Sequence, residues 1–313
     1  MKTRVLLANP RGFCAGVDRA IDIVNQALKK FGSPIYVRHE VVHNKAVVEE
    51  LKSKGVIFVD ELSEVPQSSH VIFSAHGVSE KVEREAAAFN LLSFDATCPL
   101  VTKVHGEVQR HVRAGRDIIL IGHKGHPEVE GTLGRHNPIG TKSNIYLVQD
   151  EEEARLLKVS QPENLAYVTQ TTLSLDDTIA IVKILYEQFP KILKPKSDDI
   201  CYATQNRQDA VKQLALESEF IIVIGSRNSS NSNRLKELAE KCGASSILID
   251  GAEELDFKIL SKYKSIGITA GASAPESIVQ SVVQAISSEF NTVANELGEN
   301  KENIYFRLPR QLR

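Results

Sequence analysis

The chain has 313 residues, of which 42% are hydrophobic and 25% are charged, a composition that excludes a disordered or fibrous protein. The 38 Lys and Arg nearly balance the 40 Asp and Glu, giving a net charge of -2. No block of Lys and Arg stands out along the chain, so we expect no broad binding to nucleic acid or to a membrane surface.

Two further absences favour a cytoplasmic location. No apolar stretch approaches the roughly 20 residues that span a bilayer, and the first ten residues lack the long apolar segment of a secretory signal. Four cysteines in a chain of this length make no dense disulfide framework. We therefore expect reduced thiols that are available for metal binding or catalysis.

Short apolar runs alternate with longer helical patterns along the chain. The runs predicted as strands are residues 4–8, 34–38, 71–74, 117–121, 165–168, 220–224, 246–249 and 265–268. Parallel strands are covered on both faces and need not alternate apolar with polar residues, so we expect parallel sheets. The alternation of strand and helix predicts an α/β fold. A last strand-like segment, 304–307, follows a polar linker.

Polar residues follow five of the predicted strands, at 75–77, 122–126, 169–174, 225–233 and 269–273. Ligands bind at the carboxyl ends of strands in open α/β sheets, so these loops together predict a binding site. In any single loop, Ser, Asn and Thr can instead simply cap the following helix.

Three of the cysteines, Cys14, Cys98 and Cys201, each come directly before a helical pattern. A helix N-terminus favours the thiolate that a soft metal needs. Three converging thiolates would suit an iron–sulfur cluster with one iron left without a protein ligand. The alternative is that free cysteines are small buried hydrophobes. Cys242 continues the apolar spacing of a helix and precedes Gly243, so we interpret it as a core residue.

An acidic residue and three histidines are candidates for acid chemistry and anion binding. Pro127 is expected to open a helix with Glu128 in its first turn, where an acid can equally serve only to complement the helix dipole. His126 precedes this helix, and His43 and His76 fall in other loops. Histidine titrates near neutrality and can donate to an anion.

A cluster of hydroxyl and amide side chains adds a possible phosphate site. Ser229, Ser230 and Asn231 precede a predicted helix, and Ser273 follows a predicted strand. Donors at helix starts suit phosphate oxygens, although helix capping would use the same residue types. Neither GxxxxGK[ST] nor GxGxxG occurs, which argues against a P-loop NTPase and a dinucleotide fingerprint.

Taken together, these segments closely resemble the LytB/IspH family, the 4-hydroxy-3-methylbut-2-enyl diphosphate reductases. The matching segments are NPRGFCAGVDR (9–19), RHEVVHN (38–44), FSAHG (73–77), DATCPLVTKVH (95–105), GHPEVEG (125–131), TQTTLS (169–174), DICYAT (199–204), GSRNSSNSNR (225–234) and AGASAP (270–275). The resemblance runs from residue 5 to about residue 310.

The resemblance implies three similar α/β domains with mostly parallel sheets around a central cavity that holds an iron–sulfur cluster. We expect these domains at 16–98, at 99–197 and at 198–286 together with 1–15, followed by a C-terminal tail at 287–313. One [4Fe-4S] cluster per chain is implied, with three ligands and one open iron site. Those ligands would be Cys14, Cys98 and Cys201.

The resemblance also implies roles for the remaining candidates. The substrate diphosphate would be bound by His43, His76, His126, Ser229, Ser230, Asn231 and Ser273. Glu128 matches the proton donor, and Thr171 matches its hydrogen-bonding neighbour near the substrate hydroxyl.

The implied reaction is the reductive dehydroxylation of an allylic diphosphate to isopentenyl and dimethylallyl diphosphate, the last step of the non-mevalonate pathway. The absence of a flavin or nicotinamide fingerprint suggests that the electrons come from another protein, and the resemblance implies a reduced ferredoxin or flavodoxin as that donor. Two alternatives come from other classes. One is a zinc hydrolase, in which thiolates with His126 and Glu128 hold the metal. The other is an iron–sulfur sensor that binds a diphosphate without converting it.

Overall fold

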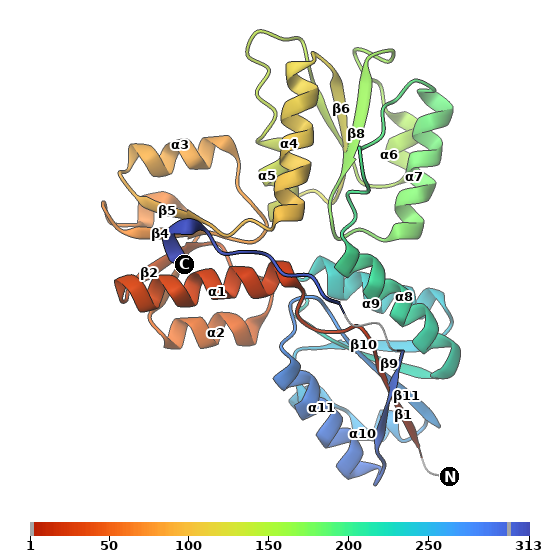
Figure 1. Cartoon of the computed structure of the whole chain (residues 1–313). Coiled ribbons are helices and arrows are strands. Elements are labelled where there is room, and N and C mark those ends of the chain that lie inside the picture. The colour runs from red at the N-terminus through yellow and green to blue at the C-terminus, as the bar shows by residue number, and fades with distance from the viewer. Residues whose placement is uncertain (1–2, 299–301) are drawn as a thin grey trace. The chain divides into compact units, whose positions relative to one another are not determined.

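The computed structural model describes residues 3–298 and 302–313, which form twelve strands and eleven α-helices (Figure 1). The strands are β1 (Arg4–Ala8), β2 (Ile35–Arg38), β3 (Val56–Val59), β4 (His70–Phe73), β5 (Leu92–Asp95), β6 (Asp117–Ile121), β7 (Ile145–Val148), β8 (Leu165–Thr169), β9 (Phe220–Ile224), β10 (Ser245–Ile249), β11 (Ser265–Ala270) and β12 (Ala294–Leu297). The helices are α1 (Ala15–Phe31), α2 (Lys45–Ser53), α3 (Glu80–Ala88), α4 (Pro99–Arg113), α5 (Pro127–Leu133), α6 (Glu151–Leu156), α7 (Leu175–Gln188), α8 (Tyr202–Glu217), α9 (Ser230–Lys241), α10 (Phe257–Leu260) and α11 (Glu276–Glu289).

The chain divides into two compact units. Unit 1 consists of Met1–Asp18, Val42–Leu51 and Tyr202–Tyr305, and unit 2 consists of Arg19–Val41, Lys52–Cys201 and Phe306–Arg313. The domain boundaries expected from the resemblance are not tested by this division and stay a prediction.

Unit 1 contains one parallel sheet in the strand order β10-β9-β11-β1-β12. Successive side chains of a strand point to opposite faces. Thus Val5 and Leu7 of β1 pack with α11, whereas Leu6 packs with α8 and α9. These helices cover the two faces of the sheet (Figure 1). Burial on both faces explains why the central strands are continuous apolar runs.

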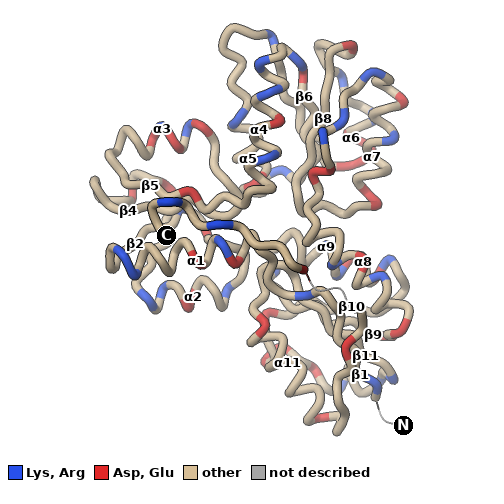
Figure 2. Tube along the Cα trace, viewed as in Figure 1, with Lys and Arg blue, Asp and Glu red and all other residues tan. Residues whose placement is uncertain are grey.

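Unit 2 contains two parallel sheets, in the strand orders β3-β2-β4-β5 and β7-β6-β8. Helix α3 packs on the first sheet through Val82 and Ala86. On the second sheet, α4 and α5 cover one face and α6 and α7 cover the other. Figure 2 shows acidic and basic residues side by side along α3, where opposite charges are near neighbours.

The structure confirms the predicted α/β class and its parallel sheets. All eight runs predicted from the sequence are strands. The four strands that the sequence did not reveal, β3, β5, β7 and β12, lie at sheet edges. An edge strand is covered less completely, so it need not be a continuous apolar run, and β5 and β12 are largely exposed.

Two sequence predictions are wrong. Residues 304–307 form no strand. Cys242 is exposed and does not belong to the core. Helix α9 ends at Lys241, with Cys242 as its C-cap and Gly243 reversing the chain at φ +91°. The apolar spacing placed Cys242 on the buried face, but the helix ends before that position and the side chain lies in solvent.

No helix within residues 3–298 and 302–313 combines the length and the apolar character needed to cross a membrane.

Candidate active site

The acidic candidate of unit 2, Glu128, lies at the start of α5 and is buried. His126 is the N-cap of this helix, and its Nδ1 accepts a hydrogen bond of 3.1 Å from the Glu128 amide. Pro127 occupies the first helical position, as its sequence context predicted. The Glu128 side chain is only 2% exposed. The first turn of α5 thus holds a carboxyl group away from water.

Thr171 is the hydrogen-bonding partner of this carboxyl group. Its backbone amide donates to Glu128 Oε1 at 2.6 Å, and its hydroxyl donates to Oε2 at 3.0 Å. Burial nevertheless raises the pKa of Glu128 to about 7, because desolvation outweighs the two hydrogen bonds, and the nearby Asp199 carboxylate adds to the rise. A carboxyl group with this pKa can carry a proton at neutral pH and give it up.

Unit 2 also holds two of the three candidate cysteines, each tied by its backbone to another candidate loop. Cys98 is the N-cap of α4, and its amide donates to the carbonyl oxygen of Ala75, next to His76. The Cys201 amide donates to the carbonyl oxygen of Thr171 at 3.0 Å. Both side chains are partly exposed and form no disulfide. Neither cysteine is therefore consumed by a disulfide bond.

The loop that carries His76 packs closely on helix α5. A Cβ atom on Gly131 of α5 would lie 3.2 Å from the carbonyl carbon and oxygen of Gly77, so the absence of a side chain permits this approach. The His76 and His126 rings then meet edge to face, with centroids 5.7 Å apart. Loops that follow β4 and β6, in two different sheets, thus bring two candidate histidines together.

Lys103 and Asp199, which were not singled out from the sequence, fix the segment that leads to Cys201. Lys103 of α4 donates to the carbonyl oxygens of Ser197 and Asp198, both at 2.7 Å, and forms an ion pair of 3.1 Å with Asp199. Asp199 Oδ2 accepts from the Thr169 amide. Both residues lie inside the segments 95–105 and 199–204, which were interpreted through their cysteines alone.

In unit 1, Cys14 ends the loop that follows β1 and directly precedes α1. The Cys14 amide donates to the carbonyl oxygen of Ala272 at 3.2 Å. Burial raises the pKa of the Cys14 thiol, and the nearby Arg207 guanidinium acts in the opposite direction. A position at a helix start is thus not enough to make this thiol acidic, because desolvation outweighs the favourable charges.

The other candidate anion-binding residues lie in the polar loops of unit 1. The Ser273 hydroxyl donates to the His43 carbonyl oxygen at 2.9 Å, and Asn231 Oδ1 accepts from the Ala272 amide at 2.9 Å. Ser229 is the N-cap of α9 and Ser230 is its first residue.

The capping alternative therefore holds for Ser229 but not for Asn231. The side-chain nitrogen of Asn231 is buried without a hydrogen-bond partner among the described residues. Since a buried donor without a partner is costly, this atom points to a ligand that accepts a hydrogen bond.

Residues 5–287 match the sequence model of a family described as LytB protein.

The chain belongs to the LytB family.

Relatives in this family are similar over their full lengths. The chain is 60% identical to the 4-hydroxy-3-methylbut-2-enyl diphosphate reductase of Saccharophagus degradans, covering 99% of both chains. It is also 60% identical to the enzyme of that name from Pseudomonas putida strain GB-1, covering 99% of this chain and 98% of the relative.

A solved structure of the E-1-hydroxy-2-methyl-but-2-enyl-4-diphosphate reductase from Plasmodium falciparum is similar with a TM-score of 0.94 and 38% identity. The match covers 100% of this chain and 97% of that chain. A second solved structure, of (E)-4-hydroxy-3-methyl-but-2-enyl diphosphate reductase, the terminal enzyme of the non-mevalonate pathway, matches with a TM-score of 0.64 and 32% identity over 91% of this chain and 99% of that one.

The LytB family implies an iron–sulfur cofactor, and the donor set of this chain fits such a group. Cys14, Cys98 and Cys201 are all outside disulfides and partly exposed, and thiolate is the usual ligand of iron–sulfur clusters. Within the described part of either unit alone, no three His, Cys, Asp or Glu side chains are grouped to hold a metal ion.

Proposed function

We propose that the chain catalyses the reductive dehydroxylation of (E)-4-hydroxy-3-methylbut-2-enyl diphosphate to isopentenyl diphosphate and dimethylallyl diphosphate. The allylic C–O bond breaks, two electrons and two protons are consumed, and water leaves. Relatives that are 60% identical over nearly the whole chain carry the name of this enzyme. The structural observation that carries the proposal is the buried Glu128 carboxyl group held by Thr171.

The proposed cofactor is one [4Fe-4S] cluster per chain. Its ligands would be Cys14 of unit 1 and Cys98 and Cys201 of unit 2, with one iron left without a protein ligand. When bound, such a cluster supplies electrons and a Lewis acid for the substrate hydroxyl. The cavity that holds it would be enclosed by the three α/β domains expected from the sequence, with boundaries at 16–98, 99–197 and 198–286 plus 1–15.

Glu128 provides the proton that the reaction needs. Hydroxide is a poor leaving group, so the hydroxyl must leave as water, and an acid has to be protonated when the C–O bond breaks. A pKa of about 7 keeps much of the Glu128 population protonated at neutral pH. Thr171 holds the carboxyl group in one orientation through two bonds, which fixes the direction of proton transfer.

The diphosphate would be bound by donors from the polar loops. In unit 1 these are His43, Ser229, Ser230, Asn231 and Ser273, and in unit 2 they are His76 and His126. The buried side-chain nitrogen of Asn231 supports this assignment, because it is a donor that lacks an acceptor within the described residues. A reduced ferredoxin or flavodoxin in the cytoplasm would deliver the electrons.

The decisive experiment is an anaerobic assay with a chemical reductant. Protein purified without air should be brown, contain iron and sulfide, and convert the allylic diphosphate to the two products. A colourless zinc protein would favour a hydrolase, and a brown protein that consumes no substrate would favour a sensor. Glu128→Gln should keep the iron and lose turnover. Glu130→Gln, an exposed position on the same helix, is the matched control and should keep both.

A further inference from the structure

A guanidinium group to which the proposed function assigns no role lies buried in unit 1. Arg207 of α8 is 0% exposed. Its Nε and Nη2 donate to the carbonyl oxygen of Gly12 at 3.1 and 2.8 Å, and Nη2 also reaches the carbonyl oxygen of Phe13 at 3.3 Å. These are the two residues directly before Cys14. Arg207 therefore holds the backbone that carries the proposed ligand.

Glu302 provides the negative charge that this buried cation requires. Its two carboxylate oxygens accept hydrogen bonds from Nη1 and Nη2 of Arg207 at 3.0 and 3.1 Å, which is the bidentate geometry that suits a guanidinium group. Glu302 also accepts from the side-chain amide of Asn206 at 3.0 Å. The Glu302 side chain is only 14% exposed, so solvent screens the pair little. A buried charge that loses its partner is strongly destabilised.

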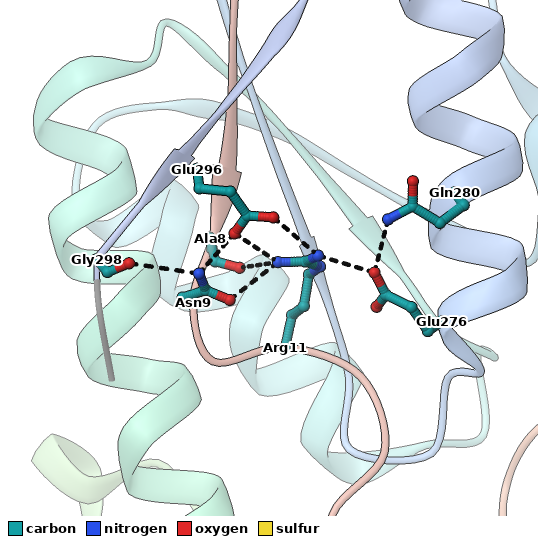
Figure 3. Close-up of polar contacts among 7 residues, drawn as sticks. All are labelled: Ala8, Asn9, Arg11, Glu276, Gln280, Glu296 and Gly298. Atoms are coloured by element: carbon teal, nitrogen blue, oxygen red, sulfur yellow. Dashed lines mark hydrogen bonds and ion pairs between the residues drawn. The ribbon is translucent and has the colours of Figure 1, made fainter. Parts of the chain in front are cut away.

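The same loop is also held by a second arginine, in a different environment. Arg11 donates to Glu276 at 2.8 Å and to Glu296 at 3.0 Å, as Figure 3 shows. Those two carboxylate side chains are 51% and 53% exposed. Exposed ion pairs contribute little, because water screens the charges. The Arg11 side chain is itself only 10% exposed, but its carboxylate partners are open to water. The stronger constraint on the loop therefore comes from Arg207 and Glu302, because both members of that pair are largely buried.

The backbone of the loop leaves little freedom once Arg207 is in place. Gly12 adopts φ +68°, and a Cβ atom there would lie 3.2 Å from the carbonyl oxygen of Ala274. Its amide donates to the carbonyl oxygen of Ala270, and the Cys14 amide donates to that of Ala272. Both the amide and the carbonyl group of Gly12 are thus bonded, so a shift of Arg207 must disturb the peptide units that lead to Cys14.

We propose that Glu302 is a positioning residue that, by neutralising Arg207, fixes the Gly12–Phe13 backbone and thereby the place of Cys14. This rests on the proposed function, in which Cys14 binds the cluster. Glu302 lies beyond residue 287, where the match to the family ends, so that match assigns it no role. A residue near the C-terminal end of the chain would thus complete the environment of a ligand near its beginning.

The test measures backbone hydrogen exchange in the full-length, anaerobically purified protein. Glu302→Gln keeps the shape of the side chain and removes its charge. A hydrogen bond to a charged group stabilises a structure more than one to a neutral group, so loss of the charge should let the loop open more often. Hydrogen exchange in peptides containing Gly12 to Cys14 should therefore accelerate roughly tenfold or more. Bound iron should also be lost faster on exposure to a chelator. Glu296→Gln, which removes a carboxylate from Arg11 instead, should change this exchange by less than about threefold.

Peptides from β9 separate a local effect from general loosening. If Glu302→Gln accelerates exchange in β9 as much as around Cys14, or leaves the Cys14 peptides unchanged, the positioning role is refuted. Should Glu302→Gln yield no folded protein, Glu302→Asp keeps the charge with a shorter reach. In this variant the exchange rate should rise by less than is expected for Glu302→Gln, and only in the Gly12–Cys14 peptides. An exchange rate equal to that of the wild type would overturn the proposal.

The exchange measurement does not depend on turnover. An inactive wild-type enzyme would overturn the proposed function while the exchange comparison could still be made.

Discussion

Replacing Glu128 by Gln tests whether burial sets the charge state of this side chain. The carboxyl group is buried, and its pKa is raised from 4.5 to about 7. The amide of Gln has nearly the same shape. Its oxygen can accept from the Thr171 amide, and its nitrogen can donate to the Thr171 hydroxyl, so both contacts can be kept. The substitution therefore removes the titration and leaves the packing in place.

The expected effect on stability depends on pH and has a defined sign. Because the folded-state pKa of Glu128 lies above its unfolded value, the neutral carboxyl group stabilises the fold below about pH 4.5, and this contribution is lost as the pH rises through 7. At about 1.4 kcal/mol for each pKa unit, the whole loss is about 3 to 4 kcal/mol. Most of it falls between pH 5 and pH 8. The amide in Glu128→Gln does not titrate, so this variant should not show the loss of stability between pH 5 and pH 8.

Urea unfolding followed by circular dichroism at pH 5 and pH 8 measures this difference. The free energy of unfolding of Glu128→Gln minus that of the wild type should be about 2 to 3 kcal/mol larger at pH 8 than at pH 5, which means that the variant gains stability relative to the wild type as the pH rises. Glu130→Gln removes the same charge from an exposed position on α5 and should show no such change. Equal differences at the two pH values would refute the argument that burial raises the pKa of Glu128.

Four other substitutions test separate parts of the site. Thr171→Val removes the hydroxyl that donates to the carboxylate, so the pKa of Glu128 should rise further and the alkaline limb of the pH–rate profile should move up by about one unit. Gly131→Ala places a methyl group 3.2 Å from the Gly77 carbonyl group; KM should rise about tenfold, while the melting temperature changes little because better helix propensity offsets the overpacking. Cys98→Ser should remove most of the bound iron and sulfide by chemical analysis, and full retention would exclude Cys98 as a ligand. Cys242→Ala should keep the iron and shift the free energy of unfolding by less than about 0.5 kcal/mol, since the thiol is exposed.

Local sequence patterns were sufficient to predict much of the fold. The central strands are buried on both faces, so they appear as apolar runs such as 117–121 and 220–224. Helix starts were also predictable, because Pro99 and Pro127 occupy first positions where a missing N–H has no effect. Edge strands such as β5 were missed because partial exposure weakens the apolar signal.

The candidate site residues could be selected from the sequence, but their interactions could not. Glu128 and Thr171 are 43 positions apart, and neither segment contains a pattern that predicts the two hydrogen bonds that Glu128 accepts from Thr171. Cys242 was wrongly predicted to be buried. Its spacing fitted the apolar face of the helix, but the helix ends one residue earlier.

The sequence by itself determined the α/β class, the helix starts and the types of chemical group available, because these depend on near neighbours in the chain. Only the tertiary structure decided which groups are desolvated and which charges are paired. Arg207 and Glu302 are separated by 95 positions along the chain, yet they form one buried ion pair. Through this pair, Arg207 holds the backbone that directly precedes Cys14. Desolvation and charge pairing depend on all atoms within a few ångströms, whatever their distance along the chain.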